Sequence, residues 1–278
     1  MAAVHAGIPI STTINTVNRQ CLSALTAVNQ ITIQIAVGQI NIGISAGVES
    51  MTQGYGPQSM PPEYAKEILA NLIAEDCLLP MGITSRNVTT DFNISCFDQD
   101  AFAALSFQRA SSAFKAGKFC NEILPVRTKA TDPKSGKTLE IMLKLAFSDA
   151  GSTHAGNASQ VSDEAAAVLL ARRSTAKKLR LPIVGKFVAA VAVGVPPRIM
   201  GIRPAVAILK VLDKTSLSKS DIDFYEINEA FASQAIYCIR QLEISMDKVN
   251  IHGGAIAIGH PLGCTGVRQI ATGLNIAK

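Results

Sequence analysis

The chain contains the stretch Gly253-Gly254-Ala255-Ile256-Ala257-Ile258-Gly259-His260-Pro261, which gives the strongest indication of its fold. Glycines and a proline bound a short apolar run, and a run between such breakers predicts a strand over residues 253–258. The following turn presents His260, and an apolar helical pattern then continues towards Ile276. An imidazole presented by such a turn can accept a proton from a nucleophile and return it.

A thiol stands near the other end of the chain, in Asn18-Arg19-Gln20-Cys21, where an apolar helical pattern runs from Cys21 to Val37. A helix N-terminus places unpaired N–H groups beside the sulfur, so this position predicts a lowered pKa for the Cys21 thiol. A thiol paired with a histidine favours acyl transfer. The alternatives are that Cys21 is a small buried hydrophobic residue and that His260 only caps the helix after Pro261.

Apolar periods and chain breakers alternate along the sequence. They predict helices over residues 21–37, 63–74, 98–117, 165–179 and 204–212, one beginning near Asn228 and one running towards Ile276; they predict strands over residues 40–46, 181–195, 223–227 and 253–258. Repeated alternation of strand and helix predicts an α/β fold.

Composition and charge exclude several classes of protein. No apolar run of the 278-residue chain is long enough to cross a bilayer, so no membrane insertion is expected. The net charge of +5 is dispersed apart from residues 171–180, which resemble the solvated end of a helix. Aromatic residues make up 5% of the chain and do not interleave with these charges, so we expect no nucleic-acid partner.

Cysteine and histidine spacing predicts neither a metal site nor a disulfide framework. The six cysteines form no close Cys-x-x-Cys pairs, and the four histidines lack the spacing of zinc ligands. We therefore expect no metal and a reducing compartment.

Three segments of the chain together resemble the thiolase family, in particular its fungal peroxisomal type. Thr16-Val17-Asn18-Arg19-Gln20-Cys21 resembles the nucleophile motif of that family, and Asn228-Glu229-Ala230-Phe231 and Gly259-His260-Pro261 resemble two further motifs. The resemblance implies a transferase that converts 3-ketoacyl-CoA and CoA into acyl-CoA and acetyl-CoA in fatty-acid β-oxidation.

The resemblance also implies a role for each candidate catalytic residue. Cys21 would take the acyl group, and His260 would activate the thiol. Asn228 would hold a water that, with His260, binds the thioester oxygen. From its own neighbourhood, Asn228 could instead be the N-cap of a helix, with Glu229 as a first-turn carboxylate.

Substrate binding and partners are likewise implied by resemblance. Ser159, within residues 152–160, resembles a residue that meets the pantetheine arm of CoA, and Met81 stands in a loop motif near the acyl chain. CoA would be a substrate, and no cofactor is implied. The expected partners are acyl-CoA and CoA, and either a second copy or an intact thiolase. The resemblance implies the peroxisome; the cytoplasm is the alternative, because no targeting signal is visible.

The expected architecture is a thiolase-like fold of two similar halves in a layered αβαβα arrangement, incomplete at both termini. Residues 1–162 would form the N-terminal half, with an inserted loop region at about residues 54–150. Residues 163–278 would form the C-terminal half. The family's closing hairpin, which carries a second reactive cysteine, has no counterpart in this sequence.

Local departures from the family pattern affect the expected activity. Glu164 replaces a usual glycine, and Arg203 replaces a small residue before Pro204. Cys264 lies in the Gly-His-Pro loop and is interpreted as a packing residue rather than a replacement for the second cysteine. Turnover is therefore in doubt, and a non-catalytic thiolase-like paralogue that binds CoA or pairs with an intact thiolase is the alternative.

Overall fold

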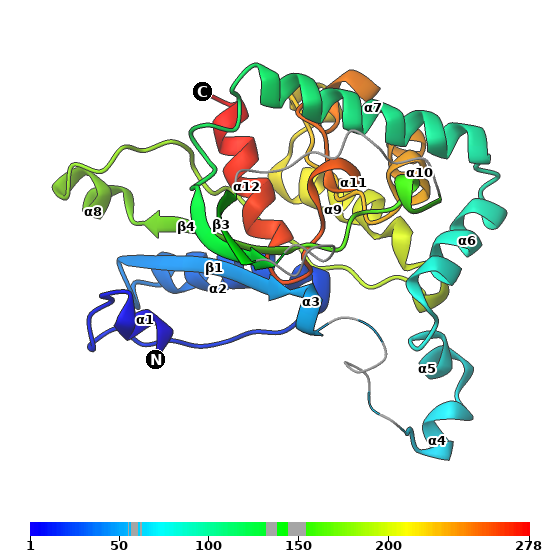
Figure 1. The fold of residues 1–278 in the computed structure, drawn as a ribbon, viewed down its shortest axis with the longest axis horizontal. Helices are drawn as coiled ribbons and strands as arrows, with labels where there is room; N and C mark the ends of the chain where they lie inside the picture. Colours follow the sequence, from blue (N-terminus) through cyan, green and yellow to red (C-terminus); the bar gives the residue numbers. More distant parts are fainter. Residues whose placement is uncertain (55, 57–60, 62, 132–137, 144–153) are drawn as a thin grey trace.

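The structure of the chain is a computed structural model that describes residues 1–54, 56, 61, 63–131, 138–143 and 154–278 (Figure 1). Its α-helices are α1 (Ala2–His5), α2 (Ser23–Ala36), α3 (Met51–Gly54), α4 (Lys66–Leu69), α5 (Leu72–Asp76), α6 (Met81–Asp91), α7 (Cys96–Lys115), α8 (Arg173–Lys178), α9 (Arg203–Thr215), α10 (Ala232–Leu242), α11 (Ala255–Ile258) and α12 (Thr265–Ile276). Its 3-10 helices are η1 (Gln20–Leu22), η3 (His154–Asn157), η4 (Pro197–Ile202), η5 (Lys219–Asp221) and η6 (Met246–Lys248).

Two antiparallel strand pairs accompany these helices. Strand β1 (Ile42–Ser50) pairs with β4 (Asp163–Ala171), from Ile42 opposite Ala171 to Ser50 opposite Asp163. Strand β2 (Val126–Thr131) pairs with β3 (Thr138–Leu143). The strand predicted at residues 40–46 is confirmed as β1, although β1 continues to Ser50.

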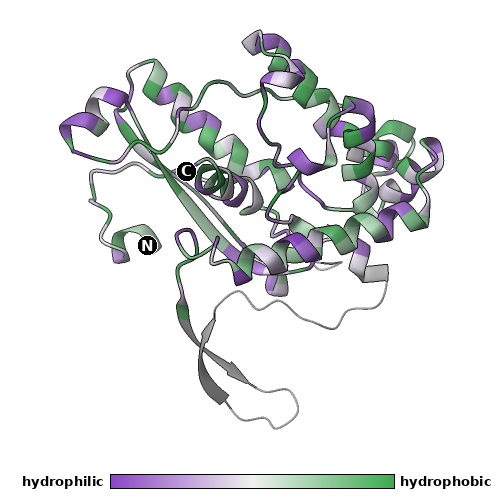
Figure 2. Ribbon diagram, turned by 90° about the horizontal axis from the view of Figure 1, so that it is seen from above, coloured by the Kyte–Doolittle hydropathy of each residue, from purple (hydrophilic) through white to green (hydrophobic). Residues whose placement is uncertain are grey.

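Helices α2 and α12 cover one face of the β1/β4 pair. Ala24, Val28 and Val267 from these helices pack against Val168 and its covered neighbours on β4. Hydrophobic residues run along much of both strands (Figure 2). No helix of the described part of the chain covers the other face, where Val48 is 76% exposed. Successive side chains of a strand point to opposite faces of the sheet, so every second residue of β1 and β4 is covered by the helices.

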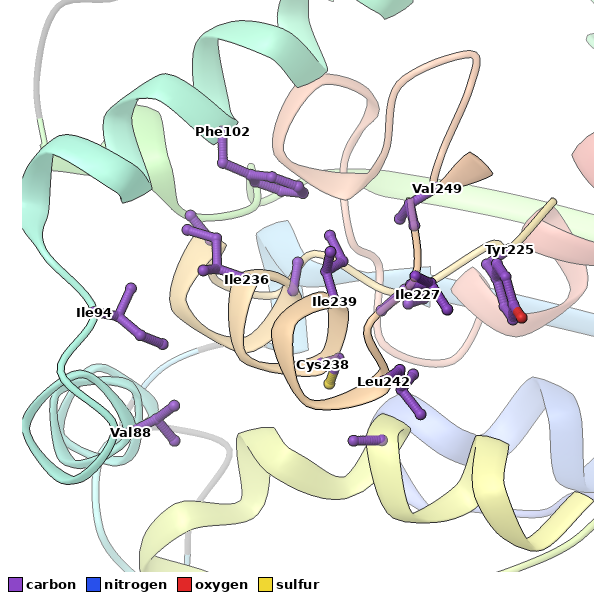
Figure 3. Packing of buried hydrophobic residues seen from close by; sticks show 14 of the residues in the cluster. Val88, Ile94, Phe102, Tyr225, Ile227, Ile236, Cys238, Ile239, Leu242 and Val249 are labelled. Atoms are coloured by element: carbon purple, nitrogen blue, oxygen red, sulfur yellow. The ribbon is translucent and has the colours of Figure 1, made fainter. Parts of the chain in front are cut away.

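The larger hydrophobic core lies around α10. Ile236, Ile239 and Leu242 of this helix pack with Val88 from α6 and Phe102 from α7 (Figure 3). Helix α7 begins where the Ser95 hydroxyl accepts a hydrogen bond from the Asp98 N–H, as an N-cap does, and it ends before Gly117, whose φ is +67°. The predicted helices at residues 98–117 and 204–212 are confirmed as α7 and α9.

The helix predicted over residues 165–179 is wrong. Residues 163–171 form β4, with alternately exposed and covered positions, and only Arg173–Lys178 are helical. An alanine-rich run has a high helix propensity, but pairing with β1 overrides it here.

Three predicted strands are also wrong. Residues 181–195 pair with no strand among the described residues, so their apolar pattern is not accompanied by a hydrogen-bond ladder. Residues 223–227 contribute a single parallel bridge, between Tyr225 and Val249. Residues 255–258 form helix α11 rather than a strand, because Gly253 has a φ of +81° and the Ile256 N–H is bound by the Glu229 carboxylate.

The predicted division into halves at residues 162 and 163 remains a prediction. The region predicted as an inserted loop, about 54–150, contains α4 to α7, β2 and β3 within its described part. Its residues 55, 57–60, 62, 132–137 and 144–150 lie outside the described residues. Throughout the described part of the chain, no helix combines the length and apolarity needed to cross a membrane.

Truncation of Leu242 tests the larger core. Its side chain is fully buried, so Leu242→Ala should lower the free energy of unfolding by about 2–5 kcal/mol, through lost burial and a cavity. Leu124→Ala is the matched control, because Leu124 is 83% exposed and its truncation should change the value by less than about 0.5 kcal/mol. Urea unfolding of both variants measures the difference. Equal losses would contradict this assignment of the core.

Candidate active site

The segment around Cys21 is held by short-range hydrogen bonds. The Asn18 amide oxygen accepts from the Gln20 N–H (3.0 Å). The Ser23 hydroxyl accepts from the Arg19 N–H (2.9 Å) and donates to the Gln20 carbonyl (2.7 Å). Cys21 therefore lies in η1, immediately before α2, with its position fixed by the residues of its own motif.

The expectation of a lowered pKa for the Cys21 thiol is wrong for this chain. Burial is the largest influence and raises the pKa, and the nearby Glu49 carboxylate raises it further. A backbone hydrogen bond and the Arg203 charge lower the pKa of Cys21, but the pKa remains raised. Removal of a thiolate from water outweighs the backbone groups at this helix start.

His260 lies in the turn between α11 and α12. Gly259 has a φ of +93°, a conformation that L side chains rarely adopt, so glycine is required there to start the turn. The His260 backbone N–H donates to the Gln160 carbonyl (3.2 Å), and the His260 side chain is buried. The turn thus presents the imidazole inward.

The neighbours of His260 determine its tautomer. His260 Nδ1 lies 2.7 Å from Thr265 Oγ1, and that hydroxyl donates its own proton to the Pro261 carbonyl (2.8 Å). Since a hydroxyl has one proton to donate, Nδ1 must carry the proton of the imidazole and donate it to Thr265. Nε2 is then the unprotonated nitrogen, which can accept a hydrogen bond.

Asn228 faces that acceptor nitrogen. Its Nδ2 lies 3.3 Å from His260 Nε2, where the amide donates to the unprotonated ring nitrogen. Asn228 Oδ1 is buried and has no hydrogen-bond partner among the described residues. The amide lies ahead of α10, which begins at Ala232, so the alternative of an N-cap role for Asn228 is wrong.

Glu229 is not the first-turn carboxylate that the sequence offered as an alternative, because α10 begins at Ala232; it holds the surrounding loops instead. The carboxylate accepts from Ser106 Oγ (2.7 Å), Asn250 Nδ2 (2.7 Å) and the Ile256 N–H (3.1 Å). Burial nevertheless raises the pKa of Glu229, with the three hydrogen bonds opposing that effect. The carboxylate therefore ties α7, the residue 250 loop and the start of α11 together.

The structure brings His260 and Asn228 into contact and places the Cys21 segment close by. A Cβ on Gly266 would lie 2.9 Å from the Leu25 backbone nitrogen, so the starts of α12 and α2 touch closely. No hydrogen bond between Cys21 and His260 occurs among the described residues. The segment of Cys21 therefore lies beside the helix that follows the His260 turn.

The two predicted substrate-binding residues lie in different surroundings. The Ser159 N–H donates to the Ala230 carbonyl (3.1 Å), so Ser159 runs beside the Asn228 segment. Residues 152 and 153 of its predicted binding segment lie outside the described residues. Met81 begins α6 and is 43% exposed; α6 packs against η4, which leads to Arg203.

Two residues of the site were missed by sequence reasoning. Thr265 fixes the His260 tautomer, and its position at the first turn of the predicted helix after Pro261 could have suggested it. Glu49 accepts a hydrogen bond from the Gly263 N–H (2.9 Å), a contact between residues 214 positions apart for which the sequence contained no signal.

Cys264 packs in the site rather than offering a second reactive thiol. Its side chain is fully buried, and burial together with the Glu164 charge raises its pKa to about 12. Within the described ranges, no cluster of three or more His, Cys, Asp or Glu side chains is arranged to hold a metal ion.

Comparison with known families identifies two matching domains. Residues 1–174 match the family model described as "Thiolase, N-terminal domain", and residues 181–278 match the one described as "Thiolase, C-terminal domain".

Curated relatives and solved structures agree with this match. The chain is 52% identical over 288 residues to the peroxisomal 3-ketoacyl-CoA thiolase of Saccharomyces cerevisiae, and the match spans 100% of this chain and 69% of that relative. The crystal structure of the dimeric peroxisomal thiolase of S. cerevisiae superposes with a TM-score of 0.88 at 50% identity, covering 99% of this chain and 73% of that one. A second structure of the yeast enzyme, described as five layered α-β-α-β-α from two core domains of identical topology, gives a TM-score of 0.78 at 49% identity and covers 100% and 70%. The predicted layered α/β fold is therefore confirmed.

Acidification tests the burial of a neutral His260. Burial, with a smaller contribution from Arg268, lowers the pKa of His260 from 6.5 to about 4. Between these pH values the unfolded chain binds a proton on His260 that the folded chain does not, so the stabilisation present above pH 6.5 is lost as the pH falls to about 4. This difference corresponds to about 3 kcal/mol.

The measurement is urea unfolding of the unmodified chain and of His260→Asn at several pH values from 7 to 4. The difference in unfolding free energy between the two should shrink by about 3 kcal/mol on acidification. A difference that stays constant over this range would show that His260 is not held neutral.

Proposed function

The chain belongs to the thiolase family, and on that basis we propose that it transfers the acyl group of a 3-ketoacyl-CoA to CoA, giving acyl-CoA and acetyl-CoA as in fatty-acid β-oxidation. The observation that carries the proposal is the contact between His260 Nε2 and Asn228 Nδ2 at 3.3 Å, beside the segment of Cys21. This contact pairs an unprotonated ring nitrogen with an amide in a buried site.

In the first step, His260 acts as the base. Nε2 accepts the Cys21 proton, and the sulfur attacks the C3 carbonyl carbon of the substrate. The bond between C2 and C3 then breaks, its electron pair goes with the departing acetyl-CoA, and C2 takes up the proton that His260 Nε2 received from Cys21, which leaves the imidazole neutral again. The acyl group remains on Cys21 until the thiol of CoA attacks it, which restores the Cys21 thiol.

The same two residues stabilise the charge that develops on the acyl oxygen. Once Nε2 carries the proton, it can donate a hydrogen bond to that oxygen. Asn228 Oδ1, buried and without a partner among the described residues, can accept from a water that donates to the same oxygen. Thr265 keeps Nδ1 as the donor at the far side of the ring, so the ring orientation is retained throughout.

Binding and assembly complete the proposal. Ser159, beside the Asn228 segment, would contact the pantetheine arm, and Met81 would contact the acyl chain. CoA acts as a substrate, and the reaction needs no resident cofactor. The yeast thiolase is described as dimeric and the relatives as peroxisomal, which supports dimerisation and action in the peroxisome. The partner in the dimer would be a second copy of the chain or an intact thiolase.

A second candidate function is that of a non-catalytic, CoA-binding thiolase-like protein. The pKa of the Cys21 thiol is raised while that of His260 is lowered to about 4, so in the empty chain the base is poorly matched to the acid. Proton transfer between groups whose pKa values lie far apart is unfavourable. This observation favours slow acyl transfer or none.

Turnover with acetoacetyl-CoA and CoA distinguishes the two functions. We expect slow loss of the ketoacyl thioester, followed by its absorbance, and complete loss of activity in Cys21→Ala. His260→Asn should reduce the rate by about a hundred- to ten-thousandfold, because it removes the base. Cys264→Ala is the matched control and should keep the rate, since that thiol is buried with a pKa of about 12.

An unmodified chain that binds CoA but shows no turnover above that of Cys21→Ala would overturn the proposed catalysis in favour of the second candidate. Loss of activity in Cys264→Ala with retention in Cys21→Ala would instead show that the nucleophile is misassigned.

A further inference from the structure

Two carboxyl side chains face each other beside the His260 turn. Glu49 and Glu164 are direct partners in the antiparallel β1/β4 register, so their side chains leave the sheet on the same face. Both are half-buried, and that face is the one covered by α2 and α12. The neighbouring pair, Ser50 and Asp163, points the other way and is joined by its own hydrogen bond (2.9 Å).

Glu49 holds the end of the turn that leads into α12. Its Oε2 accepts from the Gly263 N–H at 2.9 Å. The strand approaches the turn closely here, because a Cβ on Gly47 would lie 2.8 Å from the Cα of Cys264. A glycine in the strand thus allows the contact, and the Glu49 carboxylate supplies its polar bond.

Glu164 lies at the opposite end of the same turn. A Cβ on Gly259 would lie 2.7 Å from Glu164 Oε1, so this carboxyl packs directly against the residue that starts the turn. Ser162 Oγ donates to the same oxygen (3.1 Å) and also lies against Gly259. The His260 turn is therefore bracketed at Gly259 and Gly263 by two side chains from opposite strands.

Like charges in this arrangement need compensation. Two carboxylates opposite each other in a sheet repel. Burial raises the pKa of Glu164, and the Arg268 guanidinium and Ser162 oppose that effect. The other ionisable neighbours on the packed elements of the described chain are His260 and Cys264, which are buried, and Cys21 at the start of α2, whose pKa the Glu49 charge raises.

We propose that Glu49 and Glu164 are positioning residues that hold the two ends of the His260 turn against the β1/β4 sheet and so keep the imidazole on Asn228. Neither side chain contacts the reacting atoms; each acts through the backbone of the turn. The inference rests on the proposed function for its catalytic meaning, but the position of the imidazole can be measured without turnover.

The expected effect follows from the geometry. Without the bond to Gly263, the turn can move away from the strand, and His260 loses its alignment with Asn228. Misplacement by about 1 Å can reduce a rate about a hundredfold. A released imidazole also becomes more accessible to water, so its pKa should rise from about 4 towards 6.5.

The test is nitrogen-15 NMR of histidine-labelled protein, followed over pH, in the full chain. The His260 signals are assigned by their absence in His260→Asn. In Glu49→Ala the His260 pKa should rise by about one or more, whereas Glu49→Gln should stay near the original value, because its amide oxygen still accepts from Gly263. Glu164→Ala, which removes the packing against Gly259, should shift the His260 signals in the same direction.

Asp163→Ala is the matched control. It removes a carboxyl next to Glu164 and its bonds to Ser50 and Thr52, but it leaves the turn untouched. If Glu49→Ala does not fold, Glu49→Asp serves in its place, since the shorter side chain keeps the charge but cannot reach the Gly263 N–H. An unchanged His260 pKa in the Glu49 variant that folds, or an equal shift in Asp163→Ala, would overturn the proposal.

Discussion

The buried carboxylate of Glu229 is the interaction on which the arrangement of the site depends. It accepts hydrogen bonds from Ser106 on α7, from Asn250 and from the start of α11, and so joins three segments far apart in sequence. Burying a carboxylate costs free energy unless its oxygens accept hydrogen bonds. The folded chain therefore has to bring these three donors together around Glu229. Gly254 belongs to the same constraint, because a side chain there would collide with the Glu229 carboxyl.

Once α11 is fixed, the His260 turn follows from local chemistry. Gly259 allows the chain to reverse, and Thr265 determines which ring nitrogen carries the proton. Asn228 precedes Glu229 directly, so the residue that anchors the loops also places the amide against Nε2. Asn228 and Glu229 are adjacent in sequence, so the position of the catalytic amide depends on the hydrogen bonds of the buried carboxyl. Cys21 comes to the same region on a separate segment, at the start of α2.

The fold class predicted from the sequence is confirmed, whereas the roles of the candidate site residues remain predictions. Cys21, Asn228 and His260 lie in short motifs whose residue types suggest their chemistry, and two of them meet in the structure. Secondary-structure predictions failed where tertiary contacts decide. The helix predicted over residues 165–179 is replaced up to Ala171 by strand β4, which pairs with β1, and the strand predicted over residues 181–195 has no partner strand in the described chain. The pKa of Cys21 could not be predicted either, because burial depends on the packing of distant segments. Glu49 belongs to the same class, since its bond to Gly263 exists only after the sheet and α12 have met.

The proposed function requires that Cys21 accepts the acyl group and that His260 acts as its base. Peptide mapping by mass spectrometry, after brief incubation with acetoacetyl-CoA in the absence of CoA and acid quenching, tests it most directly. We predict an acetyl group on the peptide containing Cys21 and much less of it in His260→Asn, with Cys77, Cys96 and Cys120 as exposed reference thiols in the same digest. Acetylation confined to those exposed cysteines would show that Cys21 is not the acyl acceptor, and equal labelling of Cys21 with and without His260 would show that His260 is not its base.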